Sequence, residues 1–404
     1  MNMIHRFYCR IIQLAFRAAM PLLPYRQPQL LHSPADAAQL LRQKDISFIL
    51  LIADANVRRL GLTAPLESAL HQAHIAYAVY EQRTPNPTID DVEQARSLYL
   101  NAGAKAVIAV GGGSAIDCAK VVGARIARPE KTVGKMRGLL RIMRKTPLLI
   151  AVPTTAGTGS ETTLSAVITD SRTHHKYPIN DFSLIPNYAI LDADLTAGLS
   201  PYLTVTTGLD ALTHAIEAYI GRSTTKLTRS MAEEAVVLIT KNLRTACKNG
   251  HDLHARSRML RASYCAGIAF TRSYVGYVHG IAHSLGGQYG IAHGLANAVI
   301  LPCMLRHYGT SVTGKLAALA RKASLASPLE SNQDAAERMI RWIEEISCDF
   351  GIPKGFSQIR EEDIPLMARH AARECNPLYP VPVLMNREEL EAIYHKLMRK
   401  EENR

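Results

Sequence analysis

Blocks of apolar residues alternate with helix-like stretches along the first half of the chain. Short continuous apolar runs are separated by segments in which apolar residues recur at helical spacing. Runs of this kind predict strands covered on both faces, as in a parallel sheet whose connections are helices. The predicted strands are Ile46–Ala53, Ile75–Tyr80, Ala104–Val110, Pro147–Val152 and Tyr188–Asp192. The predicted helices between them are Val57–Gln72, Asp90–Ala102 and Ser114–Ala127.

The pattern changes near Asp194–Ser200, and strand-like runs become rare after that point. Apolar residues now recur at helical spacing almost to the end of the chain, which predicts a second domain built of helices. The predicted helices are Thr206–Ile220, Met231–Leu243, Arg256–Phe270, Ala317–Leu325, Ala335–Phe350 and Arg387–Leu397.

Residues 1–24 form a third kind of segment, in which apolar residues are interrupted by Arg6, Arg10 and Arg17. The spacing predicts a basic amphipathic helix that ends at Pro21 and Pro24. The apolar run is too short to span a bilayer and too broken for a secretory signal. Two interpretations stay open: a helix docked on the body of the protein, or peripheral contact with a membrane surface.

Composition narrows the class of protein. A chain of 404 residues, 47% of them hydrophobic, can bury more than one core. The net charge of +12 is compatible with nucleic acid, an anionic membrane surface or an anionic ligand. No zinc finger, RNA-binding aromatic signature or single basic block is present, so we expect no nucleic-acid partner. The seven cysteines are scattered without a CxxC pair, which favours a reducing, cytoplasmic location.

Two loops follow predicted strands and carry small or hydroxyl side chains. Gly111-Gly112-Gly113-Ser114 joins a strand to a helix, and glycines there let a phosphate approach the free N–H groups of the helix start. Pro153–Glu161 follows the next strand and is rich in threonine and glycine. Alone, the first is also compatible with a tight turn and the second with a helix cap. Neither matches GxGxxG, so the ordinary dinucleotide fingerprint is absent.

Asp54 ends the first predicted strand. A carboxylate in this place could accept hydrogen bonds from both ribose hydroxyls of an adenosine, and it would repel a 2′-phosphate. It therefore favours NAD over NADP. The alternative is that Asp54 caps the following helix.

The second half of the chain carries a cluster of residues with metal-binding chemistry. Asp210 and His214 stand four positions apart, and so do His279 and His283, with His293 ten positions later. Positions four apart lie on one face of a helix. A carboxylate and three imidazoles brought together are a suitable site for a divalent transition metal.

These motifs together resemble those of the iron-dependent (group III) alcohol dehydrogenases, which share a fold with glycerol dehydrogenases and dehydroquinate synthases. The order and spacing match from about residue 25 to about residue 398. Residues 1–24 extend beyond the common core. The matching segments are Pro85–Thr88, Gly111–Ser114 with Asp117 and Lys120, Pro153–Glu161, Ile168–Asp170, Gly208–Tyr219 and His279–Pro302.

The resemblance implies an α/β dinucleotide-binding domain over 25–197 with a parallel sheet, an all-α metal-binding domain over 198–404, and an active site in the cleft between them. It implies a divalent metal, Fe(II) or alternatively zinc, held by Asp210, His214, His279 and His293, with His283 as an additional histidine near the metal and substrate. It also implies an NAD site. The residues assigned to this site are Asp54, Asn86, Gly112, Gly113, Ser114, Thr154, Thr155, Thr158, Ser165 and Lys176.

The predicted function is hydride transfer between NAD(H) and a small primary alcohol or aldehyde, with the metal as Lewis acid on the substrate oxygen. His283 is a candidate to pass the proton towards solvent, although it could merely line the pocket. The alternative function is the same hydride transfer on an anionic substrate, such as a hydroxy-acid semialdehyde or maleylacetate. A lyase-like cyclisation and a membrane-attached protein without activity are more distant alternatives. We also expect a homo-oligomer, as is common among the proteins it resembles.

Overall fold

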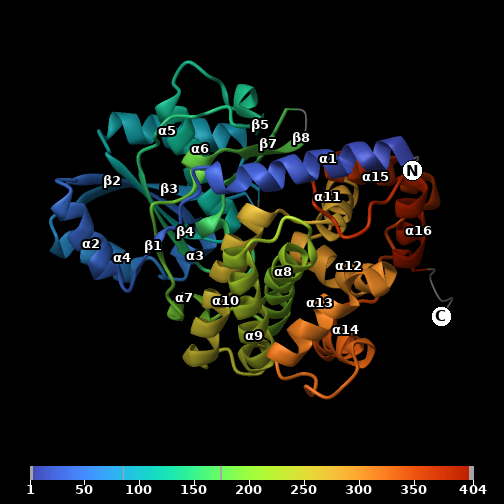
Figure 1. Cartoon of the computed structure of the whole chain (residues 1–404). Coiled ribbons are helices and arrows are strands. Elements are labelled where there is room, and N and C mark those ends of the chain that lie inside the picture. The colour runs from blue at the N-terminus through green and yellow to red at the C-terminus, as the bar shows by residue number, and fades with distance from the viewer. Residues whose placement is uncertain (1–2, 85, 173–174, 400–404) are drawn as a thin grey trace. The chain divides into compact units, whose positions relative to one another are not determined.

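The computed structural model describes residues 3–84, 86–172 and 175–399. Pro85, which belongs to one of the matching segments, lies outside the described residues. The chain forms two compact units, one of Pro24–Gly198 and one of Leu199–Arg404 together with Met1–Leu23. Figure 1 labels the helices and strands of both units.

The Pro24–Gly198 unit is built on a six-stranded parallel sheet with the strand order β1-β9-β6-β4-β2-β3. Its strands are β1 (Gln29–Leu31), β2 (Phe48–Asp54), β3 (Ala76–Gln82), β4 (Ala106–Gly111), β6 (Leu148–Pro153) and β9 (Tyr188–Ile190). The helices of the unit are α2 (Pro34–Gln43), α3 (Ala55–Arg59), α4 (Ala64–Gln72), α5 (Ile89–Asn101), α6 (Gly113–Ala127) and α7 (Asp194–Ala197).

Helices cover both faces of this sheet. Alternate residues of β2 point to opposite faces, so Leu50 and Ile52 pack with residues of α5 and α6, whereas Ile49 and Leu51 pack with residues of α2 and α4. Burial on both faces explains why the central strands read as continuous apolar runs.

A second, three-stranded sheet in this unit was not predicted. It has the order β5-β8-β7, and β7 pairs antiparallel with β8. The strands are β5 (Gly138–Leu139), β7 (Ser165–Asp170) and β8 (His175–Asn180). Short 3-10 helices lie at η2 (Val133–Met136), η3 (Ser160–Thr162) and η4 (Phe182–Leu184).

The other unit is helical and is organised around α8 (Pro201–Ile220). This helix is apolar nearly all round and buried along most of its length, as expected for a helix surrounded by others. The remaining helices are α1 (Met3–Ala19), α9 (Lys226–Lys248), α10 (Leu253–Ser273), α11 (Tyr277–Tyr289), α12 (His293–Tyr308), α13 (Thr310–Lys322), α14 (Asn332–Asp349), α15 (Ile364–Cys375) and α16 (Arg387–Leu397), with 3-10 helices η1 (Met20–Leu22) and η5 (Glu361–Asp363).

These two units confirm the predicted fold class of a parallel α/β domain followed by an all-α domain. One predicted element is wrong in detail, because the helix expected over Val57–Gln72 is two helices, α3 and α4, separated by residues 60–63. None of the described helices is long and apolar enough to cross a membrane.

Candidate functional site

The glycine loop lies at the carboxyl edge of the parallel sheet. β2, β4 and β6 are neighbours in the sheet, so the segments that follow them meet at one edge. Asp54 ends β2, Gly111 ends β4, and Thr154 follows β6. Gly112 is the N-cap of α6, and no side chain caps this helix start. The first N–H groups of α6 are therefore exposed to an anion at that edge.

The side chains around this loop approach the glycines closely. A Cβ atom on Gly113 would lie 2.9 Å from Thr158 Oγ1, and one on Gly112 would lie 3.7 Å from Thr155 Oγ1. A Cβ atom on Gly111 would lie 3.3 Å from Asp54 Cβ. The structure thus brings five of the predicted cofactor residues into one cluster, while their roles stay predictions.

Asp54 caps the helix that follows it, which was the alternative left open by the sequence. Its Oδ1 accepts hydrogen bonds from the backbone N–H groups of Asn56 (2.8 Å) and Val57 (3.2 Å). Both bonds use one oxygen of the carboxylate, so capping and ribose binding through Oδ2 are compatible.

The hydroxyl-rich loop after β6 is anchored by a buried lysine that the sequence analysis quoted without a role. Lys120 Nζ donates to Thr163 Oγ1 (2.7 Å), to the Ser165 carbonyl (2.8 Å) and to Ser160 Oγ (3.1 Å). Burial lowers the pKa of Lys120 to about 8, against the opposing effect of the Asp117 and Glu161 carboxylates. Lys176, on β8, donates to Asn86 Oδ1 at 2.7 Å. Three predicted cofactor residues, Asn86, Ser165 and Lys176, are thus positioned by these contacts.

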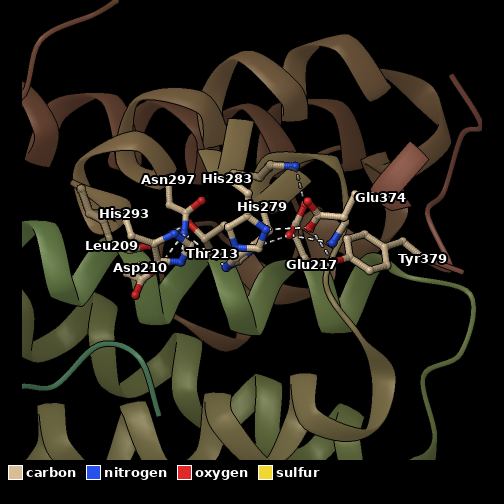
Figure 2. Close-up of polar contacts among 12 residues, drawn as sticks. Leu209, Asp210, Thr213, Glu217, His279, His283, His293, Asn297, Glu374 and Tyr379 are labelled. Atoms are coloured by element: carbon tan, nitrogen blue, oxygen red, sulfur yellow. Dashed lines mark hydrogen bonds and ion pairs between the residues drawn. The ribbon is translucent and has the colours of Figure 1, made fainter. Parts of the chain in front are cut away.

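In the helical unit, the structure brings together the four side chains that the resemblance assigns to the metal. Asp210 and His214 come from α8, His279 from α11 and His293 from the first position of α12. Each offers a ligand atom, and these atoms all lie within 4.8 Å of one another. Asp210, His214 and His279 are buried and His293 is partly exposed. Figure 2 shows Asp210, His279 and His293 pointing toward one another.

Asn297 marks the point that the ligand atoms of Asp210, His279 and His293 face. Its Nδ2 lies 2.6 Å from Asp210 Oδ1, 3.1 Å from His293 Nε2 and 3.2 Å from His279 Nε2. One carboxylate oxygen and two imidazole nitrogens facing the same point form an acceptor set that suits a divalent cation. Asn297 was not assigned from the sequence, although it lies one helical turn after His293.

Glu217, for which no role was predicted, fixes the orientation of His279. Its Oε2 lies 2.6 Å from His279 Nδ1, which leaves Nε2 directed at the site. The carboxylate also accepts from the backbone N–H groups of Gly276 (2.8 Å) and Val278 (2.9 Å). Burial raises the pKa of Glu217 to about 7, against the effect of these hydrogen bonds.

Electrostatics keep His279 neutral, which a metal ligand requires. Burial is the main cause that lowers the pKa of His279 well below its ordinary value, and the neighbouring His214, His293 and His283 add to it. The neutral ring carries its proton on Nδ1, bonded to Glu217, and a lone pair on Nε2.

His283 lies beside the four clustered side chains but is not one of them. Its ring stacks on that of His293, with centroids 5.3 Å apart and planes at 18°. Its Nδ1 lies 2.6 Å from Glu374 Oε1, and Tyr379 donates its hydroxyl to the same oxygen at 2.8 Å (Figure 2). Burial alone would raise the pKa of Glu374, but the charge of His283 and the hydrogen bonds from His283 and Tyr379 hold it below its ordinary value.

Comparisons with known proteins identify the family of this chain. Residues 32–193 match a family model described as iron-containing alcohol dehydrogenase, and residues 204–398 match the C-terminal part of the iron-containing alcohol dehydrogenase family. The chain belongs to the iron-containing alcohol dehydrogenase family. The predicted family, enzyme class and iron cofactor are thereby confirmed, and the protein is an oxidoreductase that acts on alcohols or aldehydes.

Individual relatives match more than four fifths of the chain. An NAD-dependent methanol dehydrogenase of Bacillus methanolicus is 35% identical over 82% of this chain and 87% of its own length. A 1,3-propanediol dehydrogenase of Klebsiella pneumoniae is 34% identical over 94% of this chain and 98% of its own length. A crystal structure of a 1,3-propanediol oxidoreductase superposes with a TM-score of 0.88 at 33% identity, covering 93% of this chain and 99% of the other.

Proposed function

We propose that this protein interconverts a short primary alcohol and its aldehyde with NAD(H), at an iron centre held by Asp210, His214, His279 and His293. The observation that carries the proposal is the convergence of these four side chains, whose ligand atoms lie within 4.8 Å of one another. The family membership supports the choice of iron among the divalent metals that such a donor set accepts.

The donor set fits a catalytic metal. Asp210, His214, His279 and His293 would hold the ion with three imidazoles and one carboxylate, and the partial exposure of His293 is consistent with access of substrate from solvent. A bound ion at this site supplies Lewis acidity, which stabilises negative charge on that oxygen. The chain's own part is to hold the four ligands in place, and Glu217 does so for His279 through the 2.6 Å contact with Nδ1.

We assign His283 the exchange of the substrate proton with solvent. Glu374, held ionised by its partners, accepts a hydrogen bond from His283 Nδ1–H and so leaves Nε2 as the atom that gains or loses a proton. The His283 side chain is 44% exposed, which suits exchange with water. Tyr379 keeps the Glu374 carboxylate in position through its 2.8 Å hydrogen bond.

We place the NAD site on the α/β unit, with the pyrophosphate at Gly112, Gly113 and Ser114 and the start of α6. Thr154, Thr155 and Thr158 line the same edge, with Asn86, Ser165 and Lys176 as further contacts. Asp54, with Oδ2 directed to the ribose hydroxyls, favours NAD over NADP. The methanol dehydrogenase relative is named for its dependence on NAD, which supports this choice.

The substrate class rests on the named relatives. The two curated relatives above are named for methanol and for 1,3-propanediol, which are short and uncharged. The anionic substrate considered in the sequence analysis is therefore not favoured. Assembly into a homo-oligomer stays a prediction, which sedimentation velocity would test. The cytoplasmic location also stays a prediction.

The test of the proposal is NADH oxidation by the anaerobically purified, iron-reconstituted protein with a panel of short aldehydes. We expect turnover on uncharged aldehydes of one to four carbons, with NADPH a poorer donor. Turnover restricted to carboxylated aldehydes would overturn the substrate class. Binding of neither iron nor NADH would overturn the whole proposal.

Gly113→Ala should weaken NADH binding by about tenfold, because the added Cβ would lie 2.9 Å from Thr158 Oγ1 and must push the two loops apart. Fluorescence titration of NADH measures the effect. Gly198→Ala is the matched control, since nothing lies within 4 Å of its Cβ position. Equal NADH affinities of the two variants would contradict the placement of the pyrophosphate.

His283→Phe should lower kcat by about a hundredfold, and Glu374→Gln by about tenfold, without loss of bound iron. The reason is that the first removes the proton carrier and the second removes only the charge that orients it. The measurements are kcat and the iron content of each variant. His395→Ala serves as the control, because His395 is an exposed histidine of the same unit paired with Glu361. Unchanged kcat in both variants would show that His283 merely lines the pocket.

A further inference from the structure

The N-terminal helix α1 is docked on the helical unit by a side that contains both polar and apolar residues. Arg10 donates to the carbonyls of Val381 (2.8 Å) and Pro382 (2.9 Å). Gln13 donates to the carbonyls of Tyr379 (2.7 Å) and Pro377 (3.2 Å) and is itself buried. On the same side, Cys9 is buried and Phe16 packs edge-on against Tyr274. These contacts fix which face of α1 is turned away from the protein.

The opposite side of α1 is apolar and exposed. This exposed apolar face consists of large side chains at helical spacing, with exposed fractions of 81% for Ile4, 68% for Phe7 and 65% for Leu14. Its other large members are Met3, Tyr8 and Ile11. An ordinary surface helix turns its apolar stripe to the core, whereas α1 keeps most of its large apolar side chains exposed. A contiguous exposed patch of this kind marks an interaction surface.

The surroundings of the exposed apolar face are positively charged. α1 contains no acidic residue, and Arg6 and Arg17 border the face as exposed side chains. Arg6 lies 3.8 Å from Glu389 in a surface ion pair. Beyond α1, Arg222 and Arg229 lie near Lys315. The pKa of Lys315 is lowered mainly by burial, and the positive charges of Arg229, Arg222 and Arg17 lower it further. Several cationic side chains therefore lie on and near α1.

We propose that the exposed apolar face of α1 binds the surface of an anionic lipid membrane. An amphipathic helix with apolar side chains on one face and arginines at its border lies in the plane of the headgroups, where the arginines meet lipid phosphates. The contacts of Arg10 and Gln13 hold α1 on the protein with this face outward, so binding requires no undocking. A second copy is the weaker fit, because two α1 helices packed face to face would bring arginines together without a carboxylate from either helix.

The test is co-sedimentation of the full-length protein with phosphatidylcholine vesicles, with and without phosphatidylglycerol. We expect binding to the vesicles that contain phosphatidylglycerol, weakened by salt. The double variant Phe7→Gln/Leu14→Gln should bind at least about tenfold more weakly, because it removes two of the large apolar side chains that would be buried. Arg6→Gln/Arg17→Gln should lose the preference for anionic vesicles.

The matched control is Leu60→Gln/Leu329→Gln, which removes two leucines that are 68% and 96% exposed elsewhere. It should bind vesicles as the unchanged protein does, and all variants should keep their dehydrogenase turnover. Absence of vesicle binding by the unchanged protein would overturn the proposal. So would equal binding by the Phe7/Leu14 variant, or a dimer in sedimentation velocity that this variant dissociates, since a second copy would then cover the face.

Discussion

His279→Ala should abolish iron retention and lower kcat/KM for aldehyde reduction by about a thousandfold or more. Lewis-acid stabilisation by a metal contributes several kcal/mol, and each 1.4 kcal/mol corresponds to a factor of ten in rate. His279 lies at the centre of the cluster, since its Nε2 faces the point shared with Asp210 and His293 while its Nδ1 is held by Glu217. Iron content by elemental analysis and steady-state NADH oxidation measure the two effects.

Removal of a buried imidazole can also affect folding, so a second ligand variant is needed. The side chain of His293 is 37% exposed, and His293→Ala should remove the metal with little loss of stability. Both variants should bind NADH like the unchanged protein, because the proposed NAD site uses residues of the α/β unit. His251→Ala, at an exposed histidine outside the cluster, controls for the loss of any imidazole. Normal turnover by His293→Ala with no bound iron would contradict a metal-dependent reaction.

The central strands of the sheet could be predicted because they are buried on both faces. β2 and β4 appear in the sequence as unbroken apolar runs, and their predicted bounds differ from the structure by one or two residues. The β7–β8 hairpin was missed because its strands mix polar and apolar residues and include Pro178, so no clear alternation is present. The break between α3 and α4 lies at Leu60–Thr63, where Gly61 adopts a positive φ of 71°.

The residues that support the four clustered side chains differ in how well their position along the sequence predicts their role. Glu217 stands seven positions after Asp210 and three after His214, so the helical spacing places all three on one face of α8. This spacing could have assigned Glu217 to the site. Glu374 gives no such signal, because it lies 91 residues from His283 and only the packing of α15 against α11 brings them together.

For α1 too, the spacing along the sequence predicts one feature, and contacts with distant residues decide another. The spacing of its apolar residues predicted an amphipathic helix, but periodicity alone does not show which side docks on the protein. That choice depends on the backbone carbonyls of Pro377, Tyr379, Val381 and Pro382, which accept from Arg10 and Gln13. These acceptors lie more than 360 residues away in the sequence.

Glu217→Ala should destabilise the protein by about 3–5 kcal/mol and weaken metal binding by about ten- to a hundredfold. The substitution leaves three buried donors without their acceptor: the backbone N–H groups of Gly276 and Val278 and the Nδ1–H of His279. The His279 ring also loses the contact that directs Nε2 at the cluster. Denaturant unfolding of the metal-free protein measures the first effect, and Co(II) titration measures the second.

Glu217→Gln separates the charge of Glu217 from its hydrogen bonds. The amide keeps one accepting oxygen and carries no charge, while its NH2 group replaces the other acceptor, so we expect a smaller loss of stability than in Glu217→Ala and an intermediate metal affinity. Gly276→Ala should also weaken metal binding without changing Glu217 itself, because the added Cβ would lie 2.6 Å from Glu217 Oε1 and must displace the carboxylate. If Glu217→Ala bound Co(II) as tightly as the unchanged protein, the role of Glu217 would be limited to the stability of the fold, and packing would orient His279.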